Sequence, residues 1–405
     1  MSVADENMSK LQQPKALDLF AGAGGFSLGF HWAGCQTAVA IDHDPVAVET
    51  LQANFSHLGT VALLRDLAKL TPKRLETELR QLNLPHEFDA IIGGPPCQGW
   101  SRVGRGKIRS LNTAAGRQKD SDPRNHLYEN FLRTIDHFRP KVAVMENVPG
   151  MLSHNGINVA ELVASSMDGL GFATSWALLD ATDYGLPQIR KRLFFVGIRK
   201  DLGIQFQFPS PLAPDGKRVY PLTTVKDAIS DLPILRNGSR KWIRPYVERP
   251  GVSRYAQQMR KQADRNTVFD HVCRTHNDDD LEAFRLMKEG GLYRDLPKRL
   301  KRYREDIFDD KYKKLYWARP SWCVTAHLSK DCYTHIHPSQ ARTISVREAA
   351  RLQSFPDSFY FGGNMGNKFQ MIGNAVPPLL AEEIGAAVIE QVFRRQSTSG
   401  RASVA

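Results

Sequence analysis

Residues 15–32 read KALDLFAGAGGFSLGFHW, and this stretch decides the fold. Its first six residues, Lys15 to Phe20, are mostly apolar, which is typical of a short buried strand. Three glycines between positions 22 and 25 then turn the chain, and a helical pattern begins at Phe26. A strand that passes through a glycine turn into a helix predicts the first unit of a parallel α/β sheet. The small residues of the turn would let a ligand approach the main chain closely.

The same alternation of apolar runs and helical patterns continues to about residue 148. Further strands are expected over residues 37–41, 61–64, 88–92 and 141–145, and helices over residues 45–54, 72–82 and 127–138. This order predicts a doubly wound, mostly parallel sheet, whose ligands bind beyond the carboxyl ends of the strands. The residues expected at those ends include Asp42, Asp66, Cys97 and Glu146.

The pattern changes after about residue 200, where Pro and Arg become frequent and aromatic residues are interleaved with basic ones. The loss of strand–helix alternation predicts a separate, irregular domain. Helical patterns return over residues 345–354 and 379–393.

The chain has 405 residues, of which 41% are hydrophobic and 24% charged, as in ordinary globular proteins. Lys and Arg number 55 against 43 Asp and Glu, a formal net charge of +12. This balance favours a polyanionic partner, although basic proteins without such a partner share it. The sequence shows no apolar run of membrane-spanning length and no apolar signal core near its start. Five scattered cysteines without a CxxC pair indicate a reducing compartment, so the expected location is the cytoplasm.

The glycine turn and two acids predict the kind of cofactor. Residues 20–25 do not form the spaced G-x-G-x-x-G of a pyrophosphate site, and the sequence lacks the G-K-[ST] of a nucleoside triphosphate site. Asp42 is placed to accept hydrogen bonds from ribose hydroxyls, and Asp66 from an adenine amino group. A nucleoside without phosphates fits this pattern, which points to S-adenosylmethionine.

Cys97 follows an apolar strand, two glycines and two prolines. The prolines fix φ and bias the preceding residues to extended conformations, so the thiol would stand on a rigid turn past the strand. This context fits a nucleophile, but it also fits a buried structural cysteine, the commoner fate of a free cysteine.

A group of histidines and cysteines in the second half could suggest zinc. Its members are His271, Cys273, His276, Cys323, Cys332, His335 and His337. Their spacing matches no structural zinc pattern, so no metal is expected.

Six motifs, spread over about residues 16–389, occur in an order that resembles the cytosine-5 DNA methyltransferases of the bacterial type. They are DLFAGAGG at 18–25, GPPCQ at 94–98, ENV at 146–148, QIRKR at 188–192, REAARLQSFPD at 347–357 and QMIGNAVP at 370–377. Two positions depart from the family's usual pattern. His43 stands where relatives often carry a larger aromatic residue, and Ala375 stands where many have serine.

The resemblance implies covalent catalysis on a flipped cytosine. The thiolate of Cys97 would add to C6, which makes C5 able to attack the methyl group. Glu146 would donate a proton or hydrogen bond at N3. Arg190 and Arg192, at strand spacing, would share the face that meets the base, with Arg192 at the cytosine O2. Gln98, beside the nucleophile, is also assigned to the catalytic set.

The resemblance also implies residues for the cofactor and for DNA. The cofactor set is Phe20, Ala21, Gly22, Gly24, Gly25, Asp42, Asp66, Pro96, Asn374 and Val376. The long basic loop over residues 98–124 is expected to close over the flipped cytosine, or to be a disordered surface loop in the free enzyme. Its DNA-binding candidates are Ser101, Arg102, Arg105 and Lys107. Candidates in the recognition region are Arg254, Arg260, Arg319, Trp322, Lys330 and Tyr333.

The expected fold is therefore a doubly wound methyltransferase sheet with a second, smaller target-recognition domain. The expected division is a disordered tail over residues 1–14, a catalytic and cofactor-binding domain over 15–199, the recognition domain over 200–360, a segment returning to the catalytic domain over 361–394, and a disordered tail over 395–405. The expected function is methylation of C5 of cytosine in a specific site of double-stranded DNA, within a restriction-modification or phage-defence system or as a solitary enzyme. A tRNA cytosine-5 methyltransferase and an inactive DNA-binding relative are the alternatives. The enzyme is expected to act as a monomer on DNA, in the cytoplasm near the nucleoid, and to bind no membrane. Its possible protein partners are cognate restriction or defence proteins.

Overall fold

The computed structural model describes residues 13–96, 127–153, 158–212, 221–247, 250–261, 266–303 and 311–394. The chain forms two compact units. The first unit comprises Met1–Leu179, Lys191–Pro209 and Leu380–Ala405, and the second comprises Asp180–Arg190 and Ser210–Leu379. The predicted tails over 1–14 and 395–405 lie almost entirely outside the described residues.

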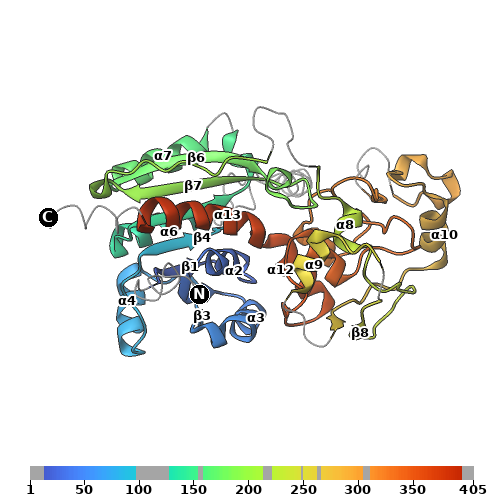
Figure 1. Ribbon diagram of the computed structural model, residues 1–405, viewed down its shortest axis with the longest axis horizontal. Coiled ribbons are helices and arrows are strands. Elements are labelled where there is room, and N and C mark those ends of the chain that lie inside the picture. The colour runs from blue at the N-terminus through green and yellow to red at the C-terminus, as the bar shows by residue number, and fades with distance from the viewer. Residues whose placement is uncertain are drawn as a thin grey trace, which may run out of the picture. The chain divides into compact units, whose positions relative to one another are not determined.

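A seven-stranded sheet forms the centre of the first unit, with strand order β3-β2-β1-β4-β5-β7-β6 (Figure 1). The strands are β1 (Lys15–Leu19), β2 (Gln36–Asp42), β3 (Val61–Leu64), β4 (Ala90–Gly93), β5 (Val142–Asn147), β6 (Phe172–Asp180) and β7 (Lys191–Arg199). The first five strands pair in parallel, and β7 pairs antiparallel with β5. The predicted mostly parallel α/β sheet is thus confirmed.

Helices cover both faces of this sheet. They are α2 (Gly25–Trp32), α3 (Pro45–Phe55), α4 (Pro72–Gln81), α6 (Leu127–Phe138), α7 (Val159–Gly169) and α13 (Pro378–Val388). Right-handed crossovers put α2 and α3 on one face and α4 and α6 on the other, because the chain reverses its direction across the sheet after β3. On the first face α13 packs against α2, since a Cβ on Gly385 would lie 2.9 Å from the Ala33 methyl group. Figure 1 shows α13, in red, in front of the sheet.

Two helix starts follow directly from the sequence. Asp44 caps α3 by accepting a hydrogen bond from the Val46 amide at 2.9 Å, and Pro45 occupies the first turn. Thr71 and Pro72 do the same for α4. One hydrophobic core cluster packs α4, α6 and α7 against the sheet through side chains such as Leu79 and Phe131.

The second unit has short elements joined by irregular chain. Its helices are α8 (Val225–Ile229), α9 (Arg254–Arg260), α10 (Asp278–Leu286), α11 (Val346–Leu352) and α12 (Met365–Asn374), and its strands are β8 (Ile243–Pro245) and β9 (Thr267–Phe269). This agrees with the loss of regular alternation in the sequence.

Buried ion pairs around α11 organise this unit. Arg342 and Glu348 pair at 2.7 Å, and Arg351 pairs with Asp357 at 2.6 Å and with Asp231 at 2.5 Å; all five side chains are almost fully buried. Removing one partner of such a pair leaves an uncompensated buried charge. The charged residues of the REAARLQSFPD motif therefore hold the fold of the second unit together.

The unit boundaries differ from the predicted domains in three places. The unit that carries the sheet continues to Pro209, where the prediction ended it at residue 199. The segment that belongs with the sheet begins at Leu380 and not at residue 361, because α12 packs within the second unit. A Cβ on Gly373 would lie 2.2 Å from the main chain of Thr325, so α12 touches the 3₁₀-helix η10 (Ala326–Ser329) and the residue before it. The short segment Asp180–Arg190 also belongs to the second unit, where Ile189 donates to the Ser321 carbonyl at 2.9 Å.

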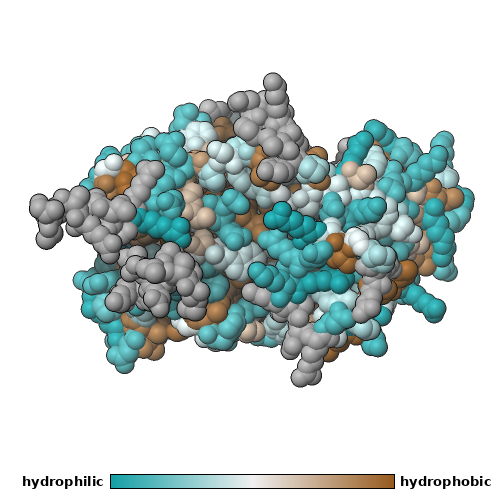
Figure 2. Space-filling view, viewed as in Figure 1, coloured by the Kyte–Doolittle hydropathy of each residue, from teal (hydrophilic) through white to brown (hydrophobic). Residues whose placement is uncertain are grey.

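Among the residues that the structure describes, one helical stretch, Met365–Arg394, is long and apolar enough by composition to cross a membrane. In its most apolar window 67% of the residues are buried inside the protein, as in the core helix of a globular protein. The face shown in Figure 2 is mostly hydrophilic, with hydrophobic side chains in scattered patches, which is normal for a protein surface.

Candidate active site

The order of the strands marks one edge of the sheet as the place for a ligand. The chain runs outward from β1 to β2 and β3, then returns to place β4 on the other side of β1. Ligands of open α/β sheets bind beyond the carboxyl ends of the strands at such a reversal. The ends of β1 and β4 approach so closely that a Cβ on Gly93 would lie 2.6 Å from the Leu19 carbonyl oxygen. The glycine turn and the turn before Cys97 are therefore neighbours.

The glycine turn after β1 contains residues in the left-handed region of backbone conformation. Gly22 and Gly24 have φ values of 55° and 85°, and Phe20 shares this region at 58°. A Cβ on Gly24 would lie 2.6 Å from the Phe55 ring, whereas the corresponding position at Gly22 has no other atom within 4 Å. The main chain at Gly22 is thus open to a ligand.

Asp42, at the end of β2, holds this turn in place. Its Oδ2 accepts a hydrogen bond from the Gly22 amide at 2.8 Å, and its Oδ1 accepts one from the Asp44 amide at 2.9 Å. His43 lies 3.2 Å from Oδ1. Although burial opposes the charge, the hydrogen bonds from these three residues hold the pKa of Asp42 below its usual range. The sequence predicted that Asp42 accepts hydrogen bonds from a ligand. It did not predict the hydrogen bond from the Gly22 amide to Asp42.

Asp66 lies just beyond β3 and is more exposed. Its Oδ1 accepts a hydrogen bond from the Ala68 amide at 3.0 Å, and Lys69 lies 3.2 Å from its Oδ2. Its assignment to the cofactor remains a prediction.

Asp18, on β1, is the first residue of the DLFAGAGG motif and is a buried acid. The sequence predicted no role for it. The Ser27 hydroxyl donates to its Oδ2 at 2.5 Å, while Oδ1 has no hydrogen-bond partner among the described residues. Burial raises the pKa of Asp18 to about 7, and the nearby charge of Asp42 acts in the same direction.

This pKa predicts how Asp18 affects stability. A carboxyl whose pKa is higher in the folded state contributes its full stability below the unfolded value of 3.8, and loses it as the pH rises to about 7. Asp18→Asn, which stays neutral, should therefore gain stability relative to the wild type as the pH rises from 4 to 7, by on the order of a few kcal/mol. Thermal unfolding at pH 5 and pH 8 measures this. A difference in melting temperature that is the same at both pH values would contradict it.

The structure brings Glu146 and Arg192 together. Glu146 is the last residue but one of β5, and Arg192 is the second residue of the antiparallel β7. The Arg192 Nε lies 2.9 Å from the Glu146 Oε1. Both side chains are largely buried, at 11% and 14% exposure. A Cβ on Gly94 would lie 3.4 Å from the Glu146 Oε2, so this acid faces the turn that leads to Cys97.

The neighbouring residue Asn147 ties the end of β5 to the turn that follows β4. Its Nδ2 donates to the Pro95 carbonyl at 3.3 Å. The predicted acid, the predicted arginine and the Pro95-Pro96 turn thus occupy one small region at the carboxyl edge of the sheet. Pro96 is the last described residue of this turn; the predicted site residues Cys97, Gln98, Ser101, Arg102, Arg105 and Lys107 lie outside the described residues.

Comparison with known proteins decides the family. The family model described as C-5 cytosine-specific DNA methylase matches residues 15–390. The chain belongs to this family. The type II methyltransferase M1.HphI of Haemophilus parahaemolyticus is 35% identical, covering 92% of this chain and 86% of its own. M.XorII of Xanthomonas oryzae pv. oryzae, also a type II methyltransferase, is 33% identical over 95% and 87%.

Solved structures support the fold of this methylase. A candidate prophage-encoded DNA modification methyltransferase of E. coli has a TM-score of 0.72 at 25% identity, covering 93% of this chain and 99% of its own. The Dnmt2 methyltransferase of S. pombe has a TM-score of 0.57 at 15% identity, over 94% and 100%. The sequence resemblance is confirmed, and the chain is a DNA cytosine-5-methyltransferase of the type II restriction-modification kind.

The methylase places Arg190 differently from Arg192. β7 begins at Lys191, so the two arginines do not share a strand face as expected, and they belong to different units. The buried guanidinium of Arg190 donates to the carbonyls of Val324 at 2.8 Å, Gly373 at 3.1 Å and Ala375 at 2.9 Å. These contacts favour a positioning role for Arg190 over contact with the base.

Arg190 and Gln353 together hold the segment that carries the two predicted cofactor residues of the last motif. The Gln353 amide donates to the Ala375 carbonyl at 2.6 Å. Asn374 between these anchors is exposed, and Val376 is buried. Their contact with a cofactor remains a prediction.

Several candidates in the recognition region are engaged within the second unit of the methylase. Arg260 bonds to Asp231 and lies 3.9 Å from the Tyr246 ring centre, and Arg319 lies 4.5 Å from the Tyr316 ring centre. Among the described residues no cluster of three or more His, Cys, Asp or Glu is arranged to hold a metal ion. His271, for example, bonds to the Ser345 hydroxyl and the Pro233 carbonyl.

Proposed function

We propose that this methylase transfers a methyl group from S-adenosylmethionine to C5 of a flipped cytosine in a specific duplex site, through a covalent adduct between Cys97 and C6. The observation that carries this proposal is the Glu146–Arg192 pair, at 2.9 Å, beside the turn that leads to Cys97. A buried acid held by a guanidinium next to a candidate nucleophile fits covalent chemistry on a heterocycle.

The residues around the glycine turn fit S-adenosylmethionine. The main chain is open at Gly22, the Asp42 carboxylate ends the neighbouring strand, and the buried Asp18 Oδ1 has no partner among the described residues. Gly22, Asp42 and Asp66 would hold the nucleoside part, with Phe20 and Pro96 as further contacts. When bound, the cofactor would supply an electrophilic methyl group on its sulfonium.

Cys97 would begin the reaction as a thiolate. Its sulfur bonds to C6, and the electron pair of the C5–C6 double bond becomes available at C5 for the methyl group. Loss of the C5 proton to a base or water then restores the double bond as the sulfur leaves. The duplex hides both carbon atoms, so the cytosine must first leave the base stack.

Glu146 would stabilise the charge that this addition places on the ring. Arg192 binds Oε1, so the carboxyl is held in one orientation, with Oε2 on the side of Gly94. A protonated Glu146 would donate to N3 of the cytosine, and Arg192 would support the ring at O2.

Asp42→Ala should weaken cofactor binding strongly. The substitution removes the acceptor proposed for the ribose hydroxyls and also releases the Gly22 amide. We expect the Kd for S-adenosylmethionine to rise by roughly 10- to 100-fold, since hydrogen bonds to a charged group each contribute about 1.5–3 kcal/mol. Titration calorimetry measures it, with Asp66→Ala as a comparison that leaves the turn intact. An unchanged Kd in Asp42→Ala would contradict the assignment.

Duplex DNA is the proposed substrate. The formal charge of +12 suits a polyanion, and the relatives named above are type II methyltransferases. We propose a monomer that acts on DNA in the cytoplasm, with a cognate restriction or defence protein as a possible partner. The likeness to Dnmt2 at 15% identity concerns the fold alone.

Sequencing of converted DNA tests this function directly. Bisulfite treatment of DNA from E. coli cells that express the wild-type protein should leave cytosine protected at one position of one short motif. Cells that express Cys97→Ala should show no such protection. A competition between duplex DNA and tRNA for labelled methyl groups separates the alternatives. Preferential labelling of tRNA, or equal protection in both cell lines, would contradict the proposal.

A further inference from the structure

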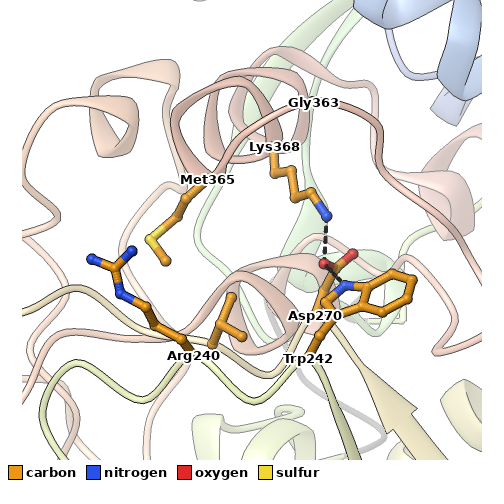
Figure 3. Close-up of a pocket in the computed structure, with 7 residues that line it drawn as sticks. Arg240, Trp242, Asp270, Gly363, Met365 and Lys368 are labelled. Atoms are coloured by element: carbon orange, nitrogen blue, oxygen red, sulfur yellow. Dashed lines mark hydrogen bonds and ion pairs between the residues drawn. The ribbon is translucent and has the colours of Figure 1, made fainter.

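We propose that a cavity in the second unit reads an amino group of a base in the target DNA, with Asp270 as the hydrogen-bond acceptor. The cavity has a volume of about 230 Å³, and its lining includes Arg240, Trp242, Asp270, Gly363, Met365 and Lys368. Figure 3 shows these side chains around one opening, with the Asp270 carboxylate between Trp242 and Lys368. The inference rests on duplex DNA as the substrate and adds a residue that determines which site is methylated.

Asp270 is a buried acid, and one of its two carboxylate oxygens has no hydrogen-bond partner among the described residues. Its Oδ1 accepts hydrogen bonds from the Trp242 Nε1 at 2.6 Å and the Lys368 Nζ at 2.5 Å. Its Oδ2 is buried and has no hydrogen-bond partner among the described residues. Burying a polar atom without a partner costs free energy, which a donor from a ligand would offset.

The main chain holds Asp270 firmly in this position. Its carbonyl accepts hydrogen bonds from the amides of Val272 at 2.8 Å and Arg347 at 3.1 Å, and its φ of 59° lies in the left-handed region. A non-glycine residue keeps such a backbone only where its surroundings hold it there. The side chain is therefore pre-oriented, as a residue that discriminates between ligands must be.

Trp242 gives the cavity an apolar wall against which the edge of a paired base can pack. Trp242 is 43% exposed as a residue, although its Nε1–H is fixed on Asp270. Arg240 is exposed at this cavity and also lines a second one of about 430 Å³, together with Arg274 and Lys330. These cations suit the phosphates on either side of a base.

The chemistry of Oδ2 selects the kind of base. A carboxylate oxygen accepts hydrogen bonds, so it favours the amino groups of cytosine, adenine or guanine and disfavours thymine. Asp and Glu are the usual side chains that accept from the cytosine amino group in the major groove. Asp270 thus fits a contact with one amino group of the recognition sequence.

A panel of modified duplexes tests this assignment. Each duplex lacks one amino group of the cognate site, with inosine for guanine, purine for adenine or 2-pyrimidinone for cytosine at non-target positions. The wild type should lose about 5- to 150-fold in kcat/KM at one position that depends on Asp270. In Asp270→Asn, Trp242 and Lys368 would attract the amide oxygen and turn the amide NH₂ to the place of Oδ2. The kcat/KM of this variant should already be reduced on the cognate duplex. It should not fall further when the amino group at that one position is removed.

Controls separate this role from a structural one. Asp279→Asn, the same change at an exposed acid of α10, should behave as the wild type on every duplex. Should Asp270→Asn fail to fold, Trp242→Phe replaces it. Phenylalanine keeps the apolar wall but lacks the Nε1–H donor that orients Asp270, so this variant should lose part of the discrimination at the same position. The proposal would be overturned if kcat/KM of Asp270→Asn fell by the same factor on every duplex. It would also be overturned if kcat/KM of the wild type did not change on removal of any one amino group. Methylation of the cognate duplex by the wild type shows independently whether the proposed function holds.

Discussion

Replacing Cys97 by serine should lower the rate of methyl transfer to duplex DNA ~10⁴-fold or more, while DNA binding changes little. A serine hydroxyl is almost never ionised at neutral pH, and the Glu146 carboxyl beside the turn is paired with Arg192 and assigned to N3 of the cytosine, so it would activate the serine poorly. Single-turnover methyl transfer measures the rate, and fluorescence anisotropy of a labelled duplex measures binding.

A matched cysteine variant controls for the loss of a thiol. Burial raises the pKa of the Cys35 thiol to about 12, so it stays protonated at neutral pH and cannot act as the nucleophile. Its sulfur donates to the Pro14 carbonyl at 3.3 Å, a hydrogen bond that serine can keep. Cys35→Ser should retain activity. Comparable activity in Cys97→Ser would remove the covalent mechanism.

Glu146→Gln should lower kcat by roughly 10²- to 10⁴-fold, the range that general acid catalysis supplies. Glutamine has nearly the same shape and can still contact the Arg192 Nε through its amide oxygen, so the site should stay assembled. It cannot deliver a proton to N3 of the cytosine. Rapid-quench measurement of the chemical step tests this, with melting temperature as a check on folding.

Arg192→Lys is the companion variant for this site. Lysine keeps the positive charge but lacks the planar guanidinium whose Nε lies 2.9 Å from the Glu146 carboxyl. The kcat of Arg192→Lys should therefore fall by less than that of Glu146→Gln. A reduction of less than tenfold in Glu146→Gln would show that Glu146 is not the acid of the reaction.

The sequence predicted the first half of the fold because its signals are local. Short apolar runs, the glycine turn before α2 and the prolines at the starts of α3 and α4 each act over a few residues. The carboxyl-end rule then placed Asp42, Glu146 and the Pro95-Pro96 turn at one edge of the sheet, where the structure has them.

Contacts between distant residues could not be predicted in the same way. Arg190 and Arg192 are two residues apart, yet only Arg192 lies in β7, because Arg190 is held by carbonyls from residues 324, 373 and 375. The cavity at Asp270 likewise combines residues between positions 240 and 368. The end of the second unit at Leu379 depends on the packing of α12 against η10, which no local pattern records.

The central claim is that Cys97 bonds to C6 of the target cytosine, and a trapping experiment tests it most directly. A duplex with 5-fluorocytosine at the target position allows addition and methyl transfer, but the fluorine at C5 cannot leave as the proton does. With S-adenosylmethionine present, the wild type should form a stable complex with this duplex that survives denaturation, and mass spectrometry should place the bond on the peptide that contains Cys97. Cys97→Ser should form none. A wild type that methylates ordinary duplex but gives no such complex, or a complex attached through another residue, would contradict the account.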